Sequence, residues 1–370
     1  MHIDAKINCA TAFTMAMDPY GRQHVVFVIK RTFDFPEAEG VICRPAAEQD
    51  ALVMSDTFWG EPGVSAPREE TDFSHIKPRC DVLLEAMAHT PEGRPRERVR
   101  VGVRLGAWSK VLDVVGDRMW LAGAITPRST DILPFVRMPI TYDRAFGGVD
   151  RLDPDDDPPH AYLPNPVGRG WHRVVNQSRL TGSPLPNIEK PGQPISLPWE
   201  SYVPMSFGPV ARGWPDRLRY AGTYDQNWID NVFPFLPRDF DIRHYQAAPE
   251  DQQIAYPTGG EPVTLVNLTP EGRTSFRLPD VDMPVVFVRR RADDVEMRAP
   301  VDTVVIRPEE RKLTLTWRAS LPLERDIFEV PECIVGHRSK AFWRARRLGK
   351  TYYPSLRTLV GASETAESSE

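Results

Sequence analysis

Proline is the feature that most limits what this chain can fold into. The sequence contains 37 prolines in 370 residues, about twice the usual share. Proline lacks a backbone N–H and clashes with the preceding helical turn, so each interior proline interrupts a helix. Of these prolines, 13 lie in residues 151–220. A protein built mainly from long helices is therefore excluded, and short strands and loops are expected.

Runs with strand periodicity lie on both sides of the proline-rich stretch. Residues 24–35 are rich in β-branched and aromatic side chains, and residues 99–105 alternate apolar residues with arginine and glycine. Both patterns are typical of strands. Residues 283–291 contain another apolar run, and residues 302–319 contain two alternating runs separated by Pro-Glu-Glu-Arg, which predicts a β-hairpin. These strands lie too close together for helical crossovers, so we expect antiparallel sheets.

The predicted fold is mainly β with few helices. We expect two antiparallel β-rich lobes, sandwich-like or barrel-like, in residues 1–150 and 221–334. The proline-rich residues 151–220 are predicted to form extended loops, and composition leaves open whether they wrap a surface, link the lobes or bind a partner. A basic helical segment is expected in residues 335–360 and an acidic disordered tail in residues 361–370.

Charge and composition exclude several classes of protein. The formal net charge of −5 argues against general binding to nucleic acid. No apolar run of about 18 residues occurs, so we expect no membrane span. The first residues lack the apolar core of a signal peptide. The four cysteines show no metal-ligand spacing and are typical of reduced thiols. We therefore expect a cytoplasmic protein.

The motifs of common enzyme classes are missing. The chain has no His-Glu-x-x-His, no phosphate-binding loop and no Gly-x-Ser-x-Gly. The acidic cluster in residues 153–157 lacks the glycine and the closing glutamate of a calcium loop, and we interpret it as a solvated loop. We therefore predict no enzyme activity, no catalytic residue and no bound cofactor or metal.

Asp239 and Asp241 form an acidic pair that supports an alternative function. Residues two apart on a strand project from the same face, where two carboxylates could hold a divalent metal. This alternative is a metal-dependent enzyme acting on a sugar or phosphate substrate. The pair could equally cap the backbone or pair with Arg238 and Arg243. Because the motif is short and common, we favour the second interpretation.

A basic run follows the last predicted strand. Arg344, Arg346 and Arg347 lie close to Phe342 and Trp343 in the sequence. On a helix they would form a basic face with two aromatic rings, which is a candidate surface for an acidic partner. Charge runs are more often solvated faces, so we favour aromatics docked on the core with the arginines in water.

Short motifs rich in glycine, proline, aromatic residues and aspartate occur in a fixed order along the chain. They are 77–78 (KP), 81–82 (DV), 116–118 (GDR), 145–148 (AFGG), 165–168 (NPVG), 185–187 (LPN), 221–225 (AGTYD), Trp228, 236–237 (LP), 239–241 (DFD), 248–249 (AP), 251–252 (DQ), 259–261 (GGE), 268–270 (LTP) and Gly272. This ordered set resembles the domain-of-unknown-function family numbered 2169, over about residues 10–320. The chain departs from the family pattern at Asn231-Val232, where another basic residue is usual, and it lacks the pentapeptide repeats of some members.

The resemblance implies a role beside the spike genes of a bacterial type VI secretion system. Proteins of this kind resemble adaptors or chaperones that bring a secreted effector to a spike protein of the VgrG or PAAR type. A structural component exported with the spike is a further alternative. The resemblance supplies no catalytic residues, and its residue types fix turns, fill cores and cap backbone. The signature residues that are candidates for partner binding or for a structural role are Tyr224, Asp225, Trp228, Asp239, Asp241 and Arg243.

Overall fold

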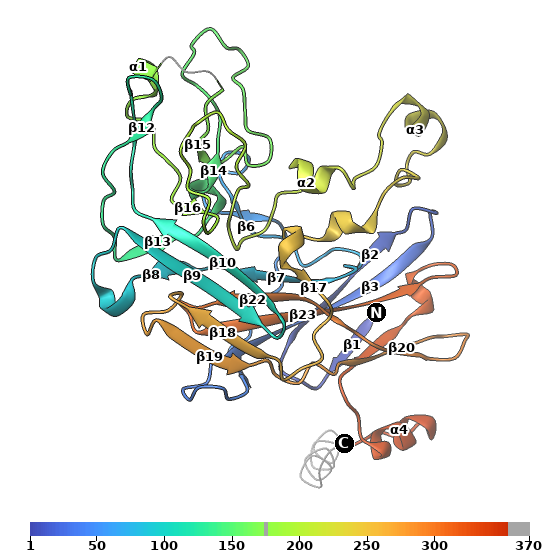
Figure 1. Ribbon diagram of the computed structural model, residues 1–370. Helices are drawn as coiled ribbons and strands as arrows, with labels where there is room; N and C mark the ends of the chain where they lie inside the picture. Colours follow the sequence, from blue (N-terminus) through green and yellow to red (C-terminus); the bar gives the residue numbers. More distant parts are fainter. Residues whose placement is uncertain (174–176, 354–370) are drawn as a thin grey trace, which may run out of the picture.

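Strands dominate the computed structural model, which describes residues 1–173 and 177–353, and they confirm the expected mainly β class (Figure 1). The α-helices within these ranges are α1 (Gln177–Leu180), α2 (Pro215–Leu218), α3 (Gln226–Asn231) and α4 (Lys340–Arg347). The 3₁₀-helices are η1 (Pro91–Gly93), η2 (Tyr142–Arg144), η3 (Ile242–Tyr245), η4 (Glu250–Gln252) and η5 (Ile327–Glu329). None of these described helices is long and apolar enough to cross a membrane.

The central sheet has the strand order β17-β7-β22-β23-β3-β2, with β4 paired to β3. Its strands are β2 (Ala10–Met17), β3 (Gln23–Asp34), β4 (Arg44–Pro45), β7 (Cys80–Leu84), β17 (Gln253–Ile254), β22 (Val301–Arg307) and β23 (Lys312–Pro322). The strand expected at residues 24–35 is β3, and β22 and β23 form the expected hairpin around residues 308–311. Most pairs are antiparallel, whereas β7 and β22 run parallel.

Two further sheets lie against the central one. The first has the order β16-β10-β9-β18-β19, and the second has the order β1-β24-β20-β21. Their strands are β1 (His2–Ala5), β9 (Arg98–Leu105), β10 (Trp108–Val115), β16 (Ile188–Glu189), β18 (Pro262–Val266), β19 (Arg273–Arg277), β20 (Pro284–Val288), β21 (Val295–Arg298) and β24 (Glu332–Val335). Short two-stranded pairs join β5 (Thr57–Phe58) to β6 (Pro67–Glu69), β8 (Met87–His89) to β13 (Arg137–Pro139), β11 (Trp120–Leu121) to β12 (Arg128–Ser129), and β14 (Phe146–Gly147) to β15 (Arg169–Gly170).

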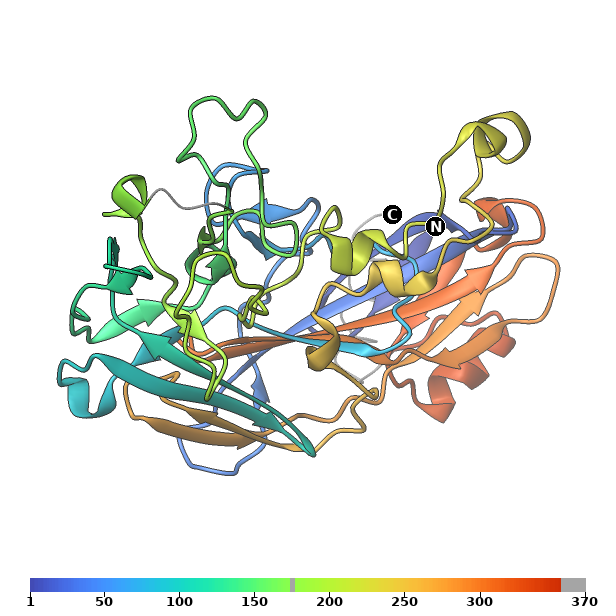
Figure 2. The ribbon, with the colours of Figure 1, turned by 45° about the horizontal axis from the view of Figure 1, so that its top comes forward.

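One hydrophobic core fills the space between these layers (Figure 2). The alternating side chains of β9 point into it, as the period of two predicts, and so do Leu313, Leu315 and Trp317 of β23. Trp317 is fully buried, and its Nε1 donates a hydrogen bond to the carbonyl oxygen of Val281 at 2.8 Å. Burial of these apolar side chains is the main stabilising contribution to the sandwich-like packing.

Strands from before and after the proline-rich residues 151–220 share each of the three large sheets. β3 pairs with β23, β9 pairs with β18, and β1 pairs with β24. The β-rich segments expected in residues 1–150 and 221–334 therefore contribute to common sheets and to one core cluster. The sheets of the described residues remain open, so the barrel-like alternative is not what the chain forms.

The remaining predicted segments are placed as follows. Residues 151–220 are mostly loops, and Leu180 and Leu185 of this stretch pack in a small cluster with Trp120 and Phe146. The C-terminal helix begins at Lys340 rather than near Val335, because Val335 is the last residue of β24 and pairs with β1 and β20. The acidic tail expected at residues 361–370, and the end of the basic segment, lie outside the described residues.

Candidate partner-binding site

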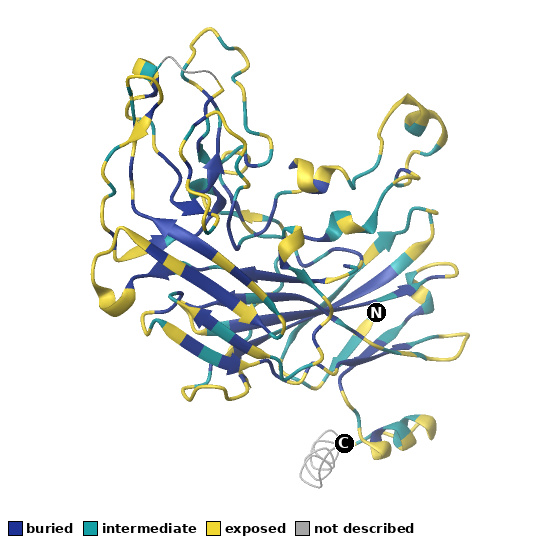
Figure 3. Ribbon diagram, in the orientation of Figure 1, coloured by how far each residue is buried: buried dark blue, intermediate teal, exposed yellow. Residues whose placement is uncertain are grey.

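The signature motif forms an arm that leaves the body of the protein. We define the arm as residues 222–240; it begins after α2, carries α3 at its tip and returns to the body at η3. Figures 1 and 2 both show α3 standing clear of the sheets. In Figure 3 the tip of the arm is coloured almost entirely as exposed. The motif that most resembles the family therefore lies on the surface.

Local chemistry closes the base of the arm. Gly222 has φ +83°, and a Cβ at this position would lie 2.8 Å from Cβ of Pro237, so a glycine is required. The Asp239 carboxylate accepts hydrogen bonds from the backbone N–H of Thr223 at 3.0 Å and from its hydroxyl at 2.7 Å. These bonds, led by that from the hydroxyl, lower the pKa of Asp239. Asp239 therefore joins the two ends of the arm.

Aromatic rings gather at the tip of the arm. Asp225 caps the N-terminus of α3, and its carboxylate accepts the N–H of Trp228 at 2.8 Å. The Trp228 ring makes edge-to-face contacts with Tyr224 and Phe233, at centroid distances of 4.8 Å and 5.5 Å. Its Nε1 donates to the carbonyl oxygen of Phe235 at 2.9 Å. We call Tyr224, Trp228, Phe233 and Phe235 the aromatic cluster.

The aromatic cluster is held in shape although much of it faces water. Tyr224 is 54% exposed and Phe233 is 66% exposed. Both rings pack edge-to-face against Trp228, whose indole is held by a hydrogen bond. Ordered, exposed aromatic rings are typical of protein-binding surfaces, because they add apolar contact at little cost in conformational entropy. The arrangement suits binding of a partner through apolar contact.

Asp241 and Arg243 stabilise the segment at which the arm returns. The Asp241 carboxylate caps η3 and accepts from the backbone N–H and from Nε of Arg243, each at 2.9 Å. The Arg243 guanidinium lowers the pKa of Asp241. It also lies 4.3 Å from the centroid of the Tyr220 ring. Both residues therefore act locally on the backbone and on one neighbouring ring.

The structure corrects the premise of the metal interpretation. Asp239 lies in a turn and Asp241 precedes a 3₁₀-helix, so the two carboxylates do not share the face of a strand. Each carboxylate is already bonded to its own neighbours. Among residues 1–173 and 177–353, no group of three or more His, Cys, Asp and Glu side chains is arranged to hold a metal ion.

A pocket of about 400 Å³ lies under the base of the arm and is lined in part by Tyr220, Arg243 and Asp251. Lys110 of β10 reaches into it, with its Nζ 2.9 Å from Oδ2 of Asp251 and 2.7 Å from Oε1 of Gln252. Burial lowers the pKa of Lys110, while the Asp251 charge opposes that change. The signature pair Asp251-Gln252 thus fastens the chain after the arm to the neighbouring sheet.

A buried ion pair anchors the same segment to the central sheet. The Asp81 carboxylate on β7 accepts from Nζ of Lys77 at 2.8 Å, from Nε2 of Gln246 at 2.5 Å and from the N–H of Ala247 at 2.7 Å. Lys77 and Asp81 are both buried. Asp81 lies about 165 positions before Gln246 and Ala247 in the sequence, so this signature residue connects distant parts of the chain.

Sequence reasoning missed Phe233, Phe235 and Tyr20. Phe235 packs on the β2–β3 turn, since a Cβ at Gly21 would lie 3.0 Å from its ring, and Tyr20 in that turn is 95% exposed. The sequence signal for Phe233 and Phe235 was an apolar run between polar residues, Val-Phe-Pro-Phe-Leu-Pro at residues 232–237.

The basic face expected near the C-terminus is separate from the arm. Phe342 is buried against Val286 and Ile334, which agrees with the favoured core docking. Arg346 pairs with Glu332 at 2.6 Å, whereas Arg344 and Arg347 are exposed. Figures 1 and 2 show α4 and α3 on opposite sides of the molecule, so the two candidate surfaces are not brought together.

Comparison with known proteins agrees with the motif analysis. The search of curated proteins and the search of solved structures each find no match. The sequence pattern of one bacterial family matches residues 20–318, which is most of the chain and includes the arm and its anchors. This protein therefore belongs to the family described as "Uncharacterized protein conserved in bacteria (DUF2169)".

Proposed function

We propose that this protein is a cytoplasmic adaptor or chaperone of a bacterial type VI secretion system. It binds a secreted effector and helps to load that effector onto a spike protein of the VgrG or PAAR type. The observation that carries the proposal is the aromatic cluster, which is exposed at the tip of an arm and fixed by a capping aspartate. The proposal assigns no catalytic step.

The anchors of the arm support an adaptor of this kind. Asp239 joins the two ends of the arm, whereas Asp251 and Asp81 join the segment after the arm to two different sheets. A surface that is already ordered loses little conformational freedom when it binds. We therefore expect stoichiometric binding in which the arm moves little.

Co-expression with the products of the neighbouring spike and effector genes tests the proposal. The wild-type chain should co-purify with the effector at a constant ratio. Changing Tyr224→Ala and Phe233→Ala together should weaken binding by about thirtyfold, because both exposed rings would leave the interface. The matched control is Trp59→Ala, which removes an exposed ring just after β5, far along the chain from the arm. Equal retention of the effector by both variants would contradict the proposal.

The fate of the protein during secretion separates an adaptor from a part of the exported spike. An adaptor should remain with the producing cells while its effector reaches the medium. Immunoblots of cell and secreted fractions measure this directly. Recovery of the protein in the secreted fraction, at the same ratio to the spike as in cells, would favour the structural component instead.

A further inference from the structure

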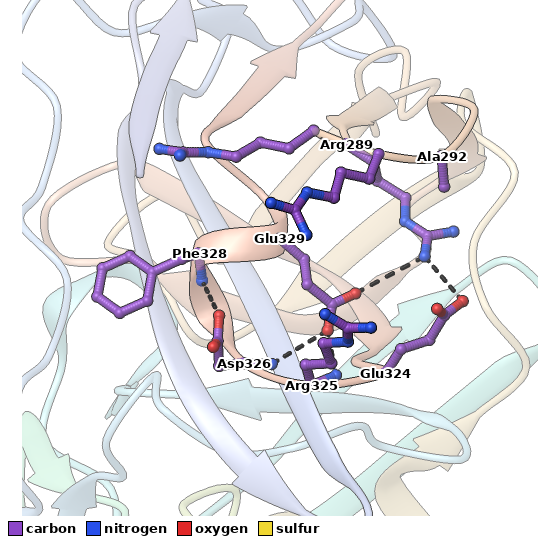
Figure 4. A pocket seen from close by; sticks show the side chains of 9 residues that line it. Arg289, Ala292, Glu324, Arg325, Asp326, Phe328 and Glu329 are labelled. Carbon is purple, nitrogen blue, oxygen red and sulfur yellow. Dashed lines mark hydrogen bonds and ion pairs between the residues drawn. The ribbon is translucent and has the colours of Figure 1, made fainter.

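A pocket lined by arginines lies between two loops at one end of the molecule. The β20–β21 connection contributes Arg289, Arg290 and Arg291, and residues 324–329 after β23 contribute the opposite wall. The pocket has a volume of about 380 Å³. Figure 4 shows Arg289 and Arg325 from the two loops, with Phe328 at the side.

The acidic groups of this pocket already have partners. Glu329 accepts from the backbone N–H groups of Arg325 and Asp326, the latter at 3.1 Å, as part of the capping box of η5. Asp326 accepts the N–H of Phe328 at 2.8 Å. Glu324 pairs with Nη2 of Arg289 at 2.9 Å. Glu324 and Glu329 therefore pair with Arg289, while Glu329 and Asp326 also satisfy backbone N–H groups.

Three cationic groups of the pocket are left over. Arg290, Arg291 and Arg325 are exposed, and no carboxylate in the described part of the chain lies within ion-pair distance of their guanidinium groups. Phe328 beside them is 73% exposed. An anionic ligand could therefore bond to these guanidinium groups without displacing a carboxylate that is already paired with them.

The β2–β3 turn contacts both the aromatic arm and Leu323, the residue just before the loop 324–329 that lines the arginine pocket. The backbone N–H of Leu323 donates a hydrogen bond to the carbonyl oxygen of Gln23 at 2.8 Å. The Nε of Arg22 donates one to the carbonyl oxygen of Leu323 at 3.3 Å. Gly21 of the same turn lies against the Phe235 ring. Figures 1 and 2 agree that the arm, this turn and the two loops lie at the same end of the molecule.

We propose that Arg290, Arg291 and Arg325, together with Phe328, bind an acidic segment of the protein partner. The apolar side chains of that segment would contact the aromatic cluster. The inference rests on the proposed function, because it specifies the chemistry of the protein that the adaptor holds. Guanidinium groups bind carboxylates through paired hydrogen bonds, and arginine and aromatic residues are enriched at protein interfaces. Small-molecule sites are enclosed and mainly apolar, unlike this exposed and charged pocket.

Peptide binding by the full-length protein tests the site. The probe is a fluorescein-labelled synthetic peptide of glutamate and phenylalanine residues, and the matched probe carries glutamine in place of glutamate. Fluorescence anisotropy should show binding of the acidic probe that weakens as salt is added. The variant Arg290→Glu/Arg291→Glu/Arg325→Glu should bind it at least about tenfold more weakly.

A second triple variant controls for net charge. Arg44→Glu/Arg128→Glu/Arg151→Glu changes the charge by the same amount on exposed residues outside the pocket, and it should bind the acidic probe like the wild type. Equal losses in the two triple variants, or none in the pocket variant, would overturn the proposal. The proposal would also be overturned if inorganic phosphate or citrate competed for the site as strongly as the unlabelled acidic peptide, because the pocket would then be a site for a small anion.

The peptide and co-purification experiments together separate failure of the pocket proposal from failure of the proposed adaptor function. If the acidic probe binds at the pocket while no effector co-purifies, the pocket stands and the adaptor function falls. If the pocket variant retains the effector as fully as the wild type, the adaptor function stands and the pocket proposal falls. Circular dichroism and the melting temperature should be unchanged in both variants, because the side chains replaced are exposed.

Discussion

The ring of Phe235 lies directly over Gly21. A Cβ at Gly21 would be 3.0 Å from Cε1 of that ring, and Gly21 has φ +82°. The residues are more than 200 positions apart, yet their contact docks the arm on the β2–β3 turn. This contact joins the aromatic cluster to the end of the molecule that carries the arginine pocket.

Gly21→Ala should therefore destabilise the protein more than a comparable glycine change elsewhere. Alanine at positive φ costs about 1–2 kcal/mol, and the clash with Phe235 should add about 1 kcal/mol. Urea unfolding measures the loss, and limited proteolysis should show faster cleavage within residues 222–240. Gly40→Ala is the matched control, because Gly40 has φ +69° and a Cβ there would meet no atom within 4 Å. Equal losses would mean that Phe235 does not restrain the arm.

Asp81→Asn should be strongly destabilising. The change leaves the Lys77 ammonium buried without its carboxylate and weakens the bonds to Gln246 and Ala247. Loss of one member of a buried pair costs about 3 kcal/mol or more. The free energy of unfolding in urea checks this. Glu271→Gln, which removes the exposed partner of Arg311, should cost less than about 1 kcal/mol. Similar values for the two variants would contradict the anchoring role.

His75 should make the protein sensitive to mild acid. Burial lowers the pKa of His75 from 6.5 to about 4, and its Nε2 lies 3.0 Å from Oγ of Ser320. The unfolded chain therefore takes up a proton at a higher pH than the folded one. Stability is fully present above about pH 6.5 and falls as the pH drops towards about 4, by up to about 3 kcal/mol.

Urea unfolding at several pH values between neutral and pH 4 measures this dependence. His75→Gln should remove most of the slope, whereas His160→Gln, at a partly exposed histidine, should leave it unchanged. The neighbouring His24 and Asp18 remain in both variants. A slope that persists in His75→Gln would show that another group is responsible.

Phe342→Ala should destabilise the C-terminal helix and the sheet beneath it. The ring is 8% exposed and packs with Val286 and Ile334. Loss of a buried phenylalanine costs about 3 kcal/mol, which thermal unfolding should reveal. Leu348→Ala, at an exposed position just after α4, should change stability by less than about 0.5 kcal/mol. A small effect of Phe342→Ala would indicate that α4 is only loosely attached.

Much of the local structure could be predicted from short stretches of sequence. The alternation in residues 99–105 predicted both the strand β9 and the side chains that it buries, because a strand places successive residues on opposite faces. The helix near the C-terminus was predicted, but its start was placed five residues too early, since nothing local shows that Val335 pairs with Val285 and Ala5. The alternative metal interpretation placed Asp239 and Asp241 on one face only because it assumed a strand there.

The sequence alone determined the mainly β class, the strand faces and the membership of a bacterial family, because periodicity and short motifs are local properties. Only the tertiary structure decided which strands pair, that segments before and after the proline-rich stretch share each large sheet, and that Asp81 holds the segment after the arm. It alone placed the arginine pocket beside the aromatic arm. The physical reason is that backbone hydrogen-bonding groups are alike in nearly every residue, so a strand does not encode its partner. Partners are selected by the packing of side chains that lie far apart in the sequence.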